Sequence, residues 1–148
     1  MSEDSPRSAS RDSARCNGIH HVNIRVPPEE IPGLSAFYSA VVGLTVGPRP
    51  PFGSPGVWLY AGERAVVHLS QCRPGETLPP PAERRSSVSH VALGCTGFAA
   101  TVQRLESRGL AFRVTEVPLT RERQIFLSDP SGVGVELIFP LDEVASSR

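Results

Sequence analysis

Four side chains that commonly bind divalent metals occur at matching places in two halves of the sequence: His21, His68, His90 and Glu136. His21 and His90 lie in two similar segments, Ile19–Ile24 and Val88–Leu93, at an offset of 90 − 21 = 69 residues. His68 corresponds in the same way to Glu136, at an offset of 136 − 68 = 68. This nearly constant offset indicates that the chain contains two copies of one structural module.

The four candidates are predicted to lie on strand faces that point away from the core, because successive side chains of a strand alternate between its two faces. Glu136 interrupts an otherwise apolar strand, and burying an unpaired carboxylate is costly. A divalent metal would offset that cost, and imidazole and carboxylate groups are common ligands for such ions. The residues alone leave other interpretations open: ordinary hydrogen-bonded histidines, and an ion pair between Glu136 and Arg25. His20 falls on the apolar side, where we expect a structural residue or a neighbour that tunes the site.

Apolar periodicity predicts one helix in each half to support these strands. The first has apolar residues at i, i+3, i+4 and i+7 and ends at Gly43: Leu34, Phe37, Tyr38 and Val41. The second carries its apolar stripe on Phe98, Val102 and Leu105, with Thr96 as the expected N-cap and Gly109 as the left-handed stop.

Short β-branched runs surround each helix and predict the strands: 22–26 and 57–70, then 88–95, 112–117, 124–128 and 133–139. The order βαβββ therefore occurs twice, which predicts an α+β fold. Asp129-Pro130-Ser131-Gly132 has residue types that favour a β-turn, so we expect it to join the last two strands.

Composition sets the boundaries of the modules. We expect residues 1–17, rich in serine and arginine, to form a disordered tail. The modules then cover 18–72 and 88–140, joined by a proline-rich linker at 73–87 and followed by a C-terminal tail at 141–148. The chain is expected to fold as one domain built from these two modules.

Charge and cysteine content exclude several classes of function. The 15 basic and 15 acidic residues balance, so neither nucleic acid nor a membrane surface is an expected partner. All 15 basic residues are arginines, which excludes Schiff-base chemistry and lysine-based phosphate loops. Three widely spaced cysteines suggest no disulfide framework, and no signal peptide or membrane span is recognised. We therefore expect a cytoplasmic protein.

The pocket around the candidates can be sketched from strand pairing. If Gly62-Glu63 forms the hairpin turn, Val57 pairs with His68 and Leu59 pairs with Val66, so that both line the pocket. Trp58 and Tyr60 would then face the helix, with Trp58 in the core. Asn23 and Arg25 share the face of His21, and Arg25 could orient an anionic substrate or form an ordinary salt bridge. The proline-rich segment 48–56 is either a closing lid or a rigid surface loop.

Residues 18–140 resemble the vicinal oxygen chelate superfamily. The resemblance rests on the pattern His-x-x-Ile-x-Val at 21–26, on His68-Leu69, on His90-Val91-Ala92-Leu93 and on Asp129-Pro-Ser-Gly-x-x-x-Glu136-Leu137. The superfamily includes glyoxalase I, fosfomycin-resistance enzymes, methylmalonyl-CoA epimerase, extradiol dioxygenases and bleomycin-binding proteins.

The resemblance implies that two βαβββ modules form a cup-shaped mixed sheet around one divalent metal ion, which would be zinc, nickel, iron, manganese or cobalt. Its ligands would be His21, His68, His90 and Glu136. Gln124 and Phe126 would also face into the cup. Members of the superfamily build the site within one chain or exchange modules between two, so the resemblance implies a homodimer but leaves the chain composition of the site open.

Three functions are consistent with this resemblance. The favoured one is a metal-dependent isomerase or lyase that chelates adjacent oxygens of a small enolisable carbonyl substrate, with Glu136 as the proton shuttle and His68 as an assisting base. The second is an extradiol-type dioxygenase of a catechol-like substrate, with iron on His21, His90 and Glu136. The third is a non-catalytic protein that binds a drug or metabolite, as bleomycin-resistance proteins do.

Overall fold

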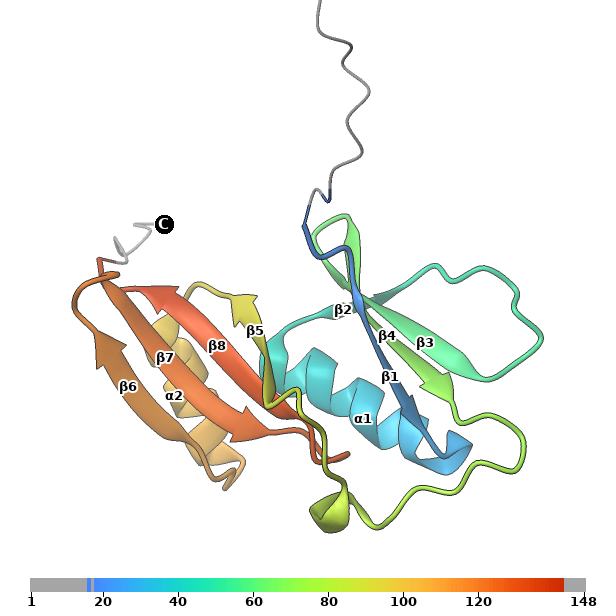
Figure 1. Cartoon of the computed structure of the whole chain (residues 1–148). Helices are drawn as coiled ribbons and strands as arrows, with labels where there is room; N and C mark the ends of the chain where they lie inside the picture. Colours follow the sequence, from blue (N-terminus) through green and yellow to red (C-terminus); the bar gives the residue numbers. More distant parts are fainter. Residues whose placement is uncertain (1–15, 17, 143–148) are drawn as a thin grey trace, which may run out of the picture.

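The computed structural model describes residue 16 and residues 18–142, and it confirms the predicted α+β fold of two βαβββ modules (Figure 1). Short 3-10 turns occur at Pro28–Glu30 and Pro81–Glu83. The first module contains β1 (Val22–Val26), α1 (Ile31–Phe37) with a π-helical extension (Tyr38–Val42), β2 (Thr45–Gly47), β3 (Gly56–Ala61) and β4 (Arg64–Gln71). The second contains β5 (His90–Gly94), α2 (Phe98–Ser107), β6 (Arg113–Val117), β7 (Glu122–Ser128) and β8 (Gly134–Pro140).

Each module forms its own four-stranded mixed sheet, and the two sheets have the same topology. The strand orders are β1-β4-β3-β2 and β5-β8-β7-β6, with the first strand of each module parallel to the last. The other pairs in both sheets are antiparallel. β1 and β5 therefore lie at sheet edges, and within the described residues the sheets are separate rather than one continuous cup.

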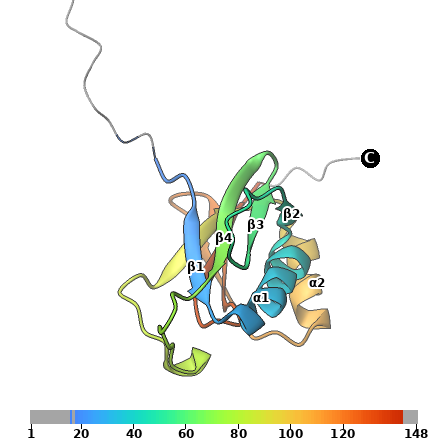
Figure 2. The same cartoon turned by 90° about the vertical axis from the view of Figure 1, so that its right-hand side faces the viewer.

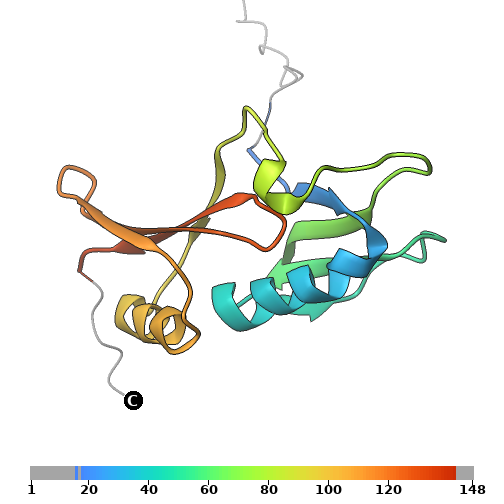
Figure 3. The ribbon, with the colours of Figure 1, turned by 90° about the horizontal axis from the view of Figure 1, so that it is seen from below.

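Both helices cover the same side of the molecule, as the views in Figures 2 and 3 show. The predicted stop at Gly43 is confirmed, because this glycine has a φ of 95° at the end of the first helical segment. Gly109 also has a positive φ, of 63°, just after α2. Thr96 is not the N-cap that the sequence suggested: Gly97 occupies that position and has no side chain of its own with which to cap the helix.

The predicted turn at Asp129–Gly132 connects β7 to β8 and also ties the second module to the first. The backbone N–H of Gly132 donates to the Asp129 carbonyl at 3.0 Å. One carboxylate oxygen of Asp129 accepts hydrogen bonds from the backbone N–H and hydroxyl of Ser131 and from the backbone N–H of Val133. The other accepts from the Tyr38 hydroxyl at 2.9 Å, and burial beside this carboxylate raises the pKa of Tyr38.

The expectation that the segment between the modules is extended and unpacked is only partly correct. Arg84 forms two hydrogen bonds to the Glu30 carboxylate, at 2.7 and 2.8 Å, and another to the Ser131 carbonyl. The hydrogen bond from Arg84 holds the pKa of Glu30 below its usual value. The segment is thus attached to both modules. The tails at 1–17 and 141–148 lie almost entirely outside the described residues.

Candidate functional site

His21 and His68 form a close pair on the side of the first sheet that points away from its helix. Their rings are stacked, with centroids 3.9 Å apart and an angle of 18° between the ring planes. His21 immediately precedes β1, and His68 lies in β4, which pairs with β1 in parallel register. His20 is exposed, not on the apolar side as expected, and its Nδ1 lies 2.9 Å from Nδ1 of His21. The first module therefore brings two of the four candidates together, with a third imidazole adjacent.

Trp58 lies against His68, where the sequence predicted Val57. The indole and imidazole rings are stacked at 4.1 Å and 7°. The turn at Gly62-Glu63 forms as expected, because Ala61 pairs with Arg64. A register shift between Leu59 and Tyr60 then leaves Trp58, not Val57, opposite His68.

This shift also overturns the assignments of the neighbouring side chains. Leu59 pairs with Val67, not with Val66, and belongs to the buried core. Val57 pairs with Leu69, another core residue, so Val57 and Leu59 face the helix side and do not line the pocket. A displacement of one residue moves every following side chain to the opposite face of a strand. Sequence reasoning missed Trp58 because the bulge has no local residue signature.

His68 has the properties of a ligand without its partner. It is only 8% exposed, and its buried Nε2 has no hydrogen-bond partner among the residues that the structure describes. Burial lowers the pKa of His68, and the adjacent His21 lowers it further. A neutral imidazole nitrogen whose lone pair accepts no hydrogen bond is the form that coordinates a metal. Nε2 of His68 therefore fits the predicted role of metal ligand.

The second module brings together His90 and Glu136. Nε2 of His90 lies 2.9 Å from a carboxylate oxygen of Glu136, whose side chain is 7% exposed. Glu136 is not paired with Arg25, because Arg25 forms its ion pair with Glu76 at 2.9 Å. The buried carboxylate thus has a partner within its own module.

The predicted pocket residues Gln124 and Phe126 share the face of Glu136. Phe126 pairs with Glu136 in the sheet register, and its ring meets His90 edge-on at 5.8 Å. Gln124 accepts a hydrogen bond from the Thr115 hydroxyl at 3.0 Å. In the first module, Asn23 likewise accepts one from the Ser70 hydroxyl at 3.1 Å. These amides therefore lie beside the candidate ligands, but each already has a side-chain partner.

The four candidates are gathered as two pairs, not as one cluster. Among the residues that the structure describes, no group of three or more histidine, cysteine, aspartate or glutamate side chains is arranged to hold a metal ion. The expectation that all four converge is therefore not met within one chain. The donor types still suit a divalent transition metal, since three imidazoles and one carboxylate remain available from the two pairs together.

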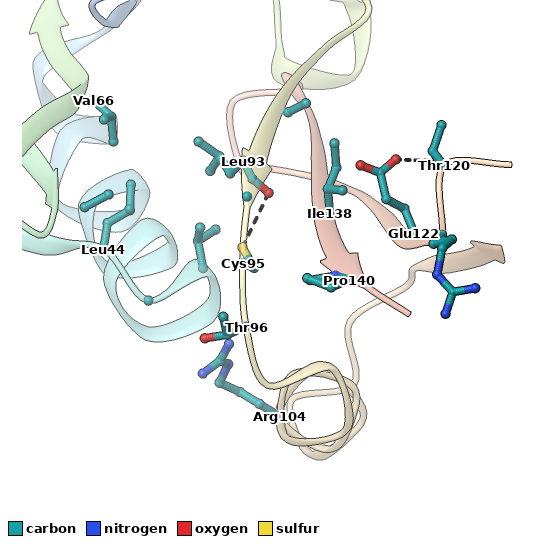
Figure 4. A pocket seen from close by; sticks show the side chains of 16 residues that line it. Leu44, Val66, Leu93, Cys95, Thr96, Arg104, Thr120, Glu122, Ile138 and Pro140 are labelled. Carbon is teal, nitrogen blue, oxygen red and sulfur yellow. Dashed lines mark hydrogen bonds between the residues drawn. The ribbon is translucent and has the colours of Figure 1, made fainter. Parts of the chain in front are cut away.

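Two cavities lie between the modules, and the side chains that line them are neighbours of the candidate ligands rather than the ligands themselves. One of about 860 Å³ is lined by residues of both modules, apolar ones such as Leu44 and Val66 together with charged ones such as Arg104 and Glu122 (Figure 4). Another, of about 620 Å³, lies between the edge strands and includes Asn23 and Arg25. Neither is lined by a candidate metal ligand.

Comparison with protein families now adds to the geometry. Residues 18–137 match the model of the Glyoxalase/Bleomycin resistance protein/Dioxygenase superfamily. The chain belongs to this superfamily. A search of curated protein sequences finds no match. The family match confirms the resemblance drawn from the histidine segments and the turn before Glu136.

Solved structures with the same fold come from proteins of different roles. A glyoxalase/dioxygenase from Nostoc punctiforme is 19% identical with a TM-score of 0.66, over 88% of this chain and 99% of that one. The fosfomycin resistance protein FosX from Listeria monocytogenes is 12% identical with a TM-score of 0.61, over 84% and 94%. TnmS3, an antibiotic binding protein from Streptomyces sp. CB03234, is 23% identical with a TM-score of 0.59, over 85% and 99%. At these identities the comparisons establish the fold alone.

No helix in the described part of the chain is long and apolar enough to cross a membrane.

Proposed function

We propose that this protein is a metal-dependent enzyme that chelates two adjacent oxygens of a small enolisable carbonyl substrate and moves a proton between its carbons, as an isomerase or lyase. The metal ligands in this proposal are His21, His68, His90 and Glu136. The observation that carries it is the buried Nε2 of His68, which has no hydrogen-bond partner in the described part of the chain and belongs to a ring stacked on a second imidazole.

The proposal requires two copies of the chain. A transition metal bound by protein side chains usually takes at least three of them, and each module offers two. We therefore propose a homodimer in which the first pair of one copy and the second pair of the other form one site. This arrangement supplies three neutral imidazoles and one carboxylate, so a bound dication keeps a net charge of +1 that favours an anionic substrate oxygen.

The residues of the chain would then have distinct tasks. A metal at this site would supply Lewis acidity toward the two substrate oxygens. Glu136 is the one carboxylate in the set, and its carboxylate oxygen is the proposed acceptor of the substrate's carbon-bound proton. It would return this proton to the neighbouring carbon. His68 would assist as a neutral base only while its Nε2 is not coordinated, because one lone pair cannot hold a metal and a proton together.

A heterodimer experiment tests whether the site is shared. His21→Ala and His90→Ala chains carrying different affinity tags are coexpressed, and the mixed dimer is isolated with both tags. If the sites are shared, the mixed dimer has two of them. One site combines the first pair that carries His21→Ala with the second pair that carries His90→Ala, and the other site carries no substitution. The mixed dimer should therefore hold about half of the wild-type metal measured by mass spectrometry, whereas each variant homodimer holds little.

The same measurement separates the alternatives. A mixed dimer as metal-poor as the variant homodimers contradicts the shared site. Iron in the wild-type protein would favour the dioxygenase alternative over carbonyl chemistry. A wild-type protein that binds no metal on titration would favour the alternative of a non-catalytic binding protein. The ion pair between His90 and Glu136 supports that alternative, because it gives the buried carboxylate a partner without a metal.

A further inference from the structure

Arg49, Phe52 and Trp58 lie together beside the first histidine pair, on a segment to which the proposed chemistry assigns no role. We propose that these three residues, here called the aromatic wall, bind an aromatic carboxylate, so that the substrate carries a ring and an anionic group next to its chelating oxygens. This inference rests on the proposed function only for the position of the substrate relative to His21 and His68.

The wall continues the stacking that begins at the candidate ligands. Trp58 is stacked on His68, and the centroid of the Phe52 ring lies 6.1 Å from that of Trp58, with the planes tilted by 46°. Phe52 remains 51% exposed, which makes it one of the large apolar side chains open to solvent. An exposed ring next to a second aromatic side chain offers a surface on which a ligand ring can stack.

Arg49 provides a positive charge that is not neutralised locally. Its guanidinium carbon lies 4.9 Å above the centre of the Phe52 ring. In the described part of the chain Arg49 has no carboxylate within ion-pair distance, whereas Arg25, Arg84, Arg121 and Arg123 each have one. A guanidinium on an aromatic face can still bind a carboxylate through its N–H groups.

The segment that carries the wall is held in place at both ends. The Tyr60 hydroxyl donates to the Pro48 carbonyl at 2.7 Å, and the Gln71 backbone N–H donates to the Pro55 carbonyl at 3.3 Å. Arg49 packs over Gly56, where an added Cβ would lie 2.9 Å from a guanidinium nitrogen. The four prolines at positions 48, 50, 51 and 55 restrict the backbone further. These contacts favour the rigid loop over the closing lid and reduce the entropic cost of binding.

The chemistry of the occupant follows from these positions. Its ring would lie on Phe52, beside Trp58, and its carboxylate would meet Arg49. Any chelating oxygens would point toward the two imidazoles. A neutral aromatic compound would lack the partner of Arg49, and a small aliphatic acid would leave Phe52 exposed. The wall therefore selects for the combination of ring and charge.

Trp58 is the only tryptophan of the chain, so intrinsic fluorescence reports directly on the wall. The test titrates phenylacetate into the full-length protein after treatment with a chelator, which removes any contribution of a metal. We expect a saturable change in fluorescence, with acetate and 2-phenylethanol binding at least about tenfold more weakly. Arg49→Gln should weaken phenylacetate binding by about tenfold, and Phe52→Leu should also weaken it.

Arg108→Gln is the matched control, because Arg108 is an exposed arginine at the end of α2, and it should bind phenylacetate like the wild type. The proposal is overturned if phenylacetate gives no saturable change, if Arg49→Gln binds it normally, or if 2-phenylethanol binds equally well. It is also overturned if Arg113→Gln, which alters the arginine over Phe126, abolishes binding while Arg49→Gln does not. Since the titration is metal-free, failure of the metal site and failure of the wall remain distinguishable.

Discussion

The two modules have the same architecture but different chemistry at equivalent positions. In each, an aromatic residue of the third strand is paired with a candidate ligand of the fourth: Trp58 with His68, and Phe126 with Glu136. In the second module the carboxylate and His90 satisfy each other. In the first, His68 is buried between the stacked rings of His21 and Trp58, and its Nε2 has no hydrogen-bond partner among the described residues. The two modules thus place a candidate metal ligand at the same position of their last strand. The type of residue at that position decides whether the side chain finds a partner within its own module.

The helices differ in a similar way. The first helical segment buries six side chains: Ile31, Leu34, Phe37, Tyr38, Val41 and Val42. The helix α2 buries two, Thr101 and Leu105. The first segment also contacts the second module, through the hydrogen bond from Tyr38 to Asp129. Equivalent elements therefore do not contribute equally to the core.

The largest expected effect concerns Glu136 and its equivalent, His68. Glu136→Gln keeps an oxygen ligand but removes the proposed base, so it should slow proton exchange by about 10²- to 10⁴-fold. The measurement is deuterium exchange at the benzylic carbon of phenylpyruvate, which carries a ring, a carboxylate and an enolisable carbonyl, with metal content determined in parallel. His68→Gln should lose less exchange activity than Glu136→Gln. Normal exchange in the metal-loaded Glu136→Gln protein would eliminate Glu136 as the base.

A second comparison concerns the shared core. Leu69 and Leu137 occupy equivalent positions in the two modules, and both are fully buried in one hydrophobic cluster. Each substitution by alanine should lower the free energy of unfolding by about 2–5 kcal/mol, measured by urea denaturation. Because the cluster spans both modules, each variant should unfold in a single transition. Separate transitions for the two modules would contradict a common core.

The smallest effect is expected at the contact between the modules. Tyr38→Phe removes the hydroxyl that donates to Asp129 and leaves a carboxylate oxygen buried without this partner. The free energy of unfolding should fall by about 1–3 kcal/mol. Tyr60→Phe is the matched control, because the Tyr60 hydroxyl donates to a carbonyl in an exposed loop, and it should cost less. Equal losses in the two variants would show that the contact between modules has no special weight.

Features that depend on residues close together in the chain could be predicted from the sequence. Apolar periodicity and the β-branched runs predicted two βαβββ modules, and glycine at 43 and 109 predicted the helix ends, because each follows from local backbone preferences. The turn before Glu136 was predictable for the same reason. The histidine segments and this turn together also identified the superfamily.

Which side chains contact one another depends on strand pairing and on the packing of the two modules, and this could not be predicted from the sequence. The bulge beside Leu59 turned Trp58 toward His68, since a register shift depends on the partner strand and not on the residues of one strand. The separation of the four candidate ligands into two pairs, and the contacts of Tyr38 and Arg84, depend on how the modules pack. Spacing along a chain specifies the face of a strand, but the distance between two faces is set by long-range packing.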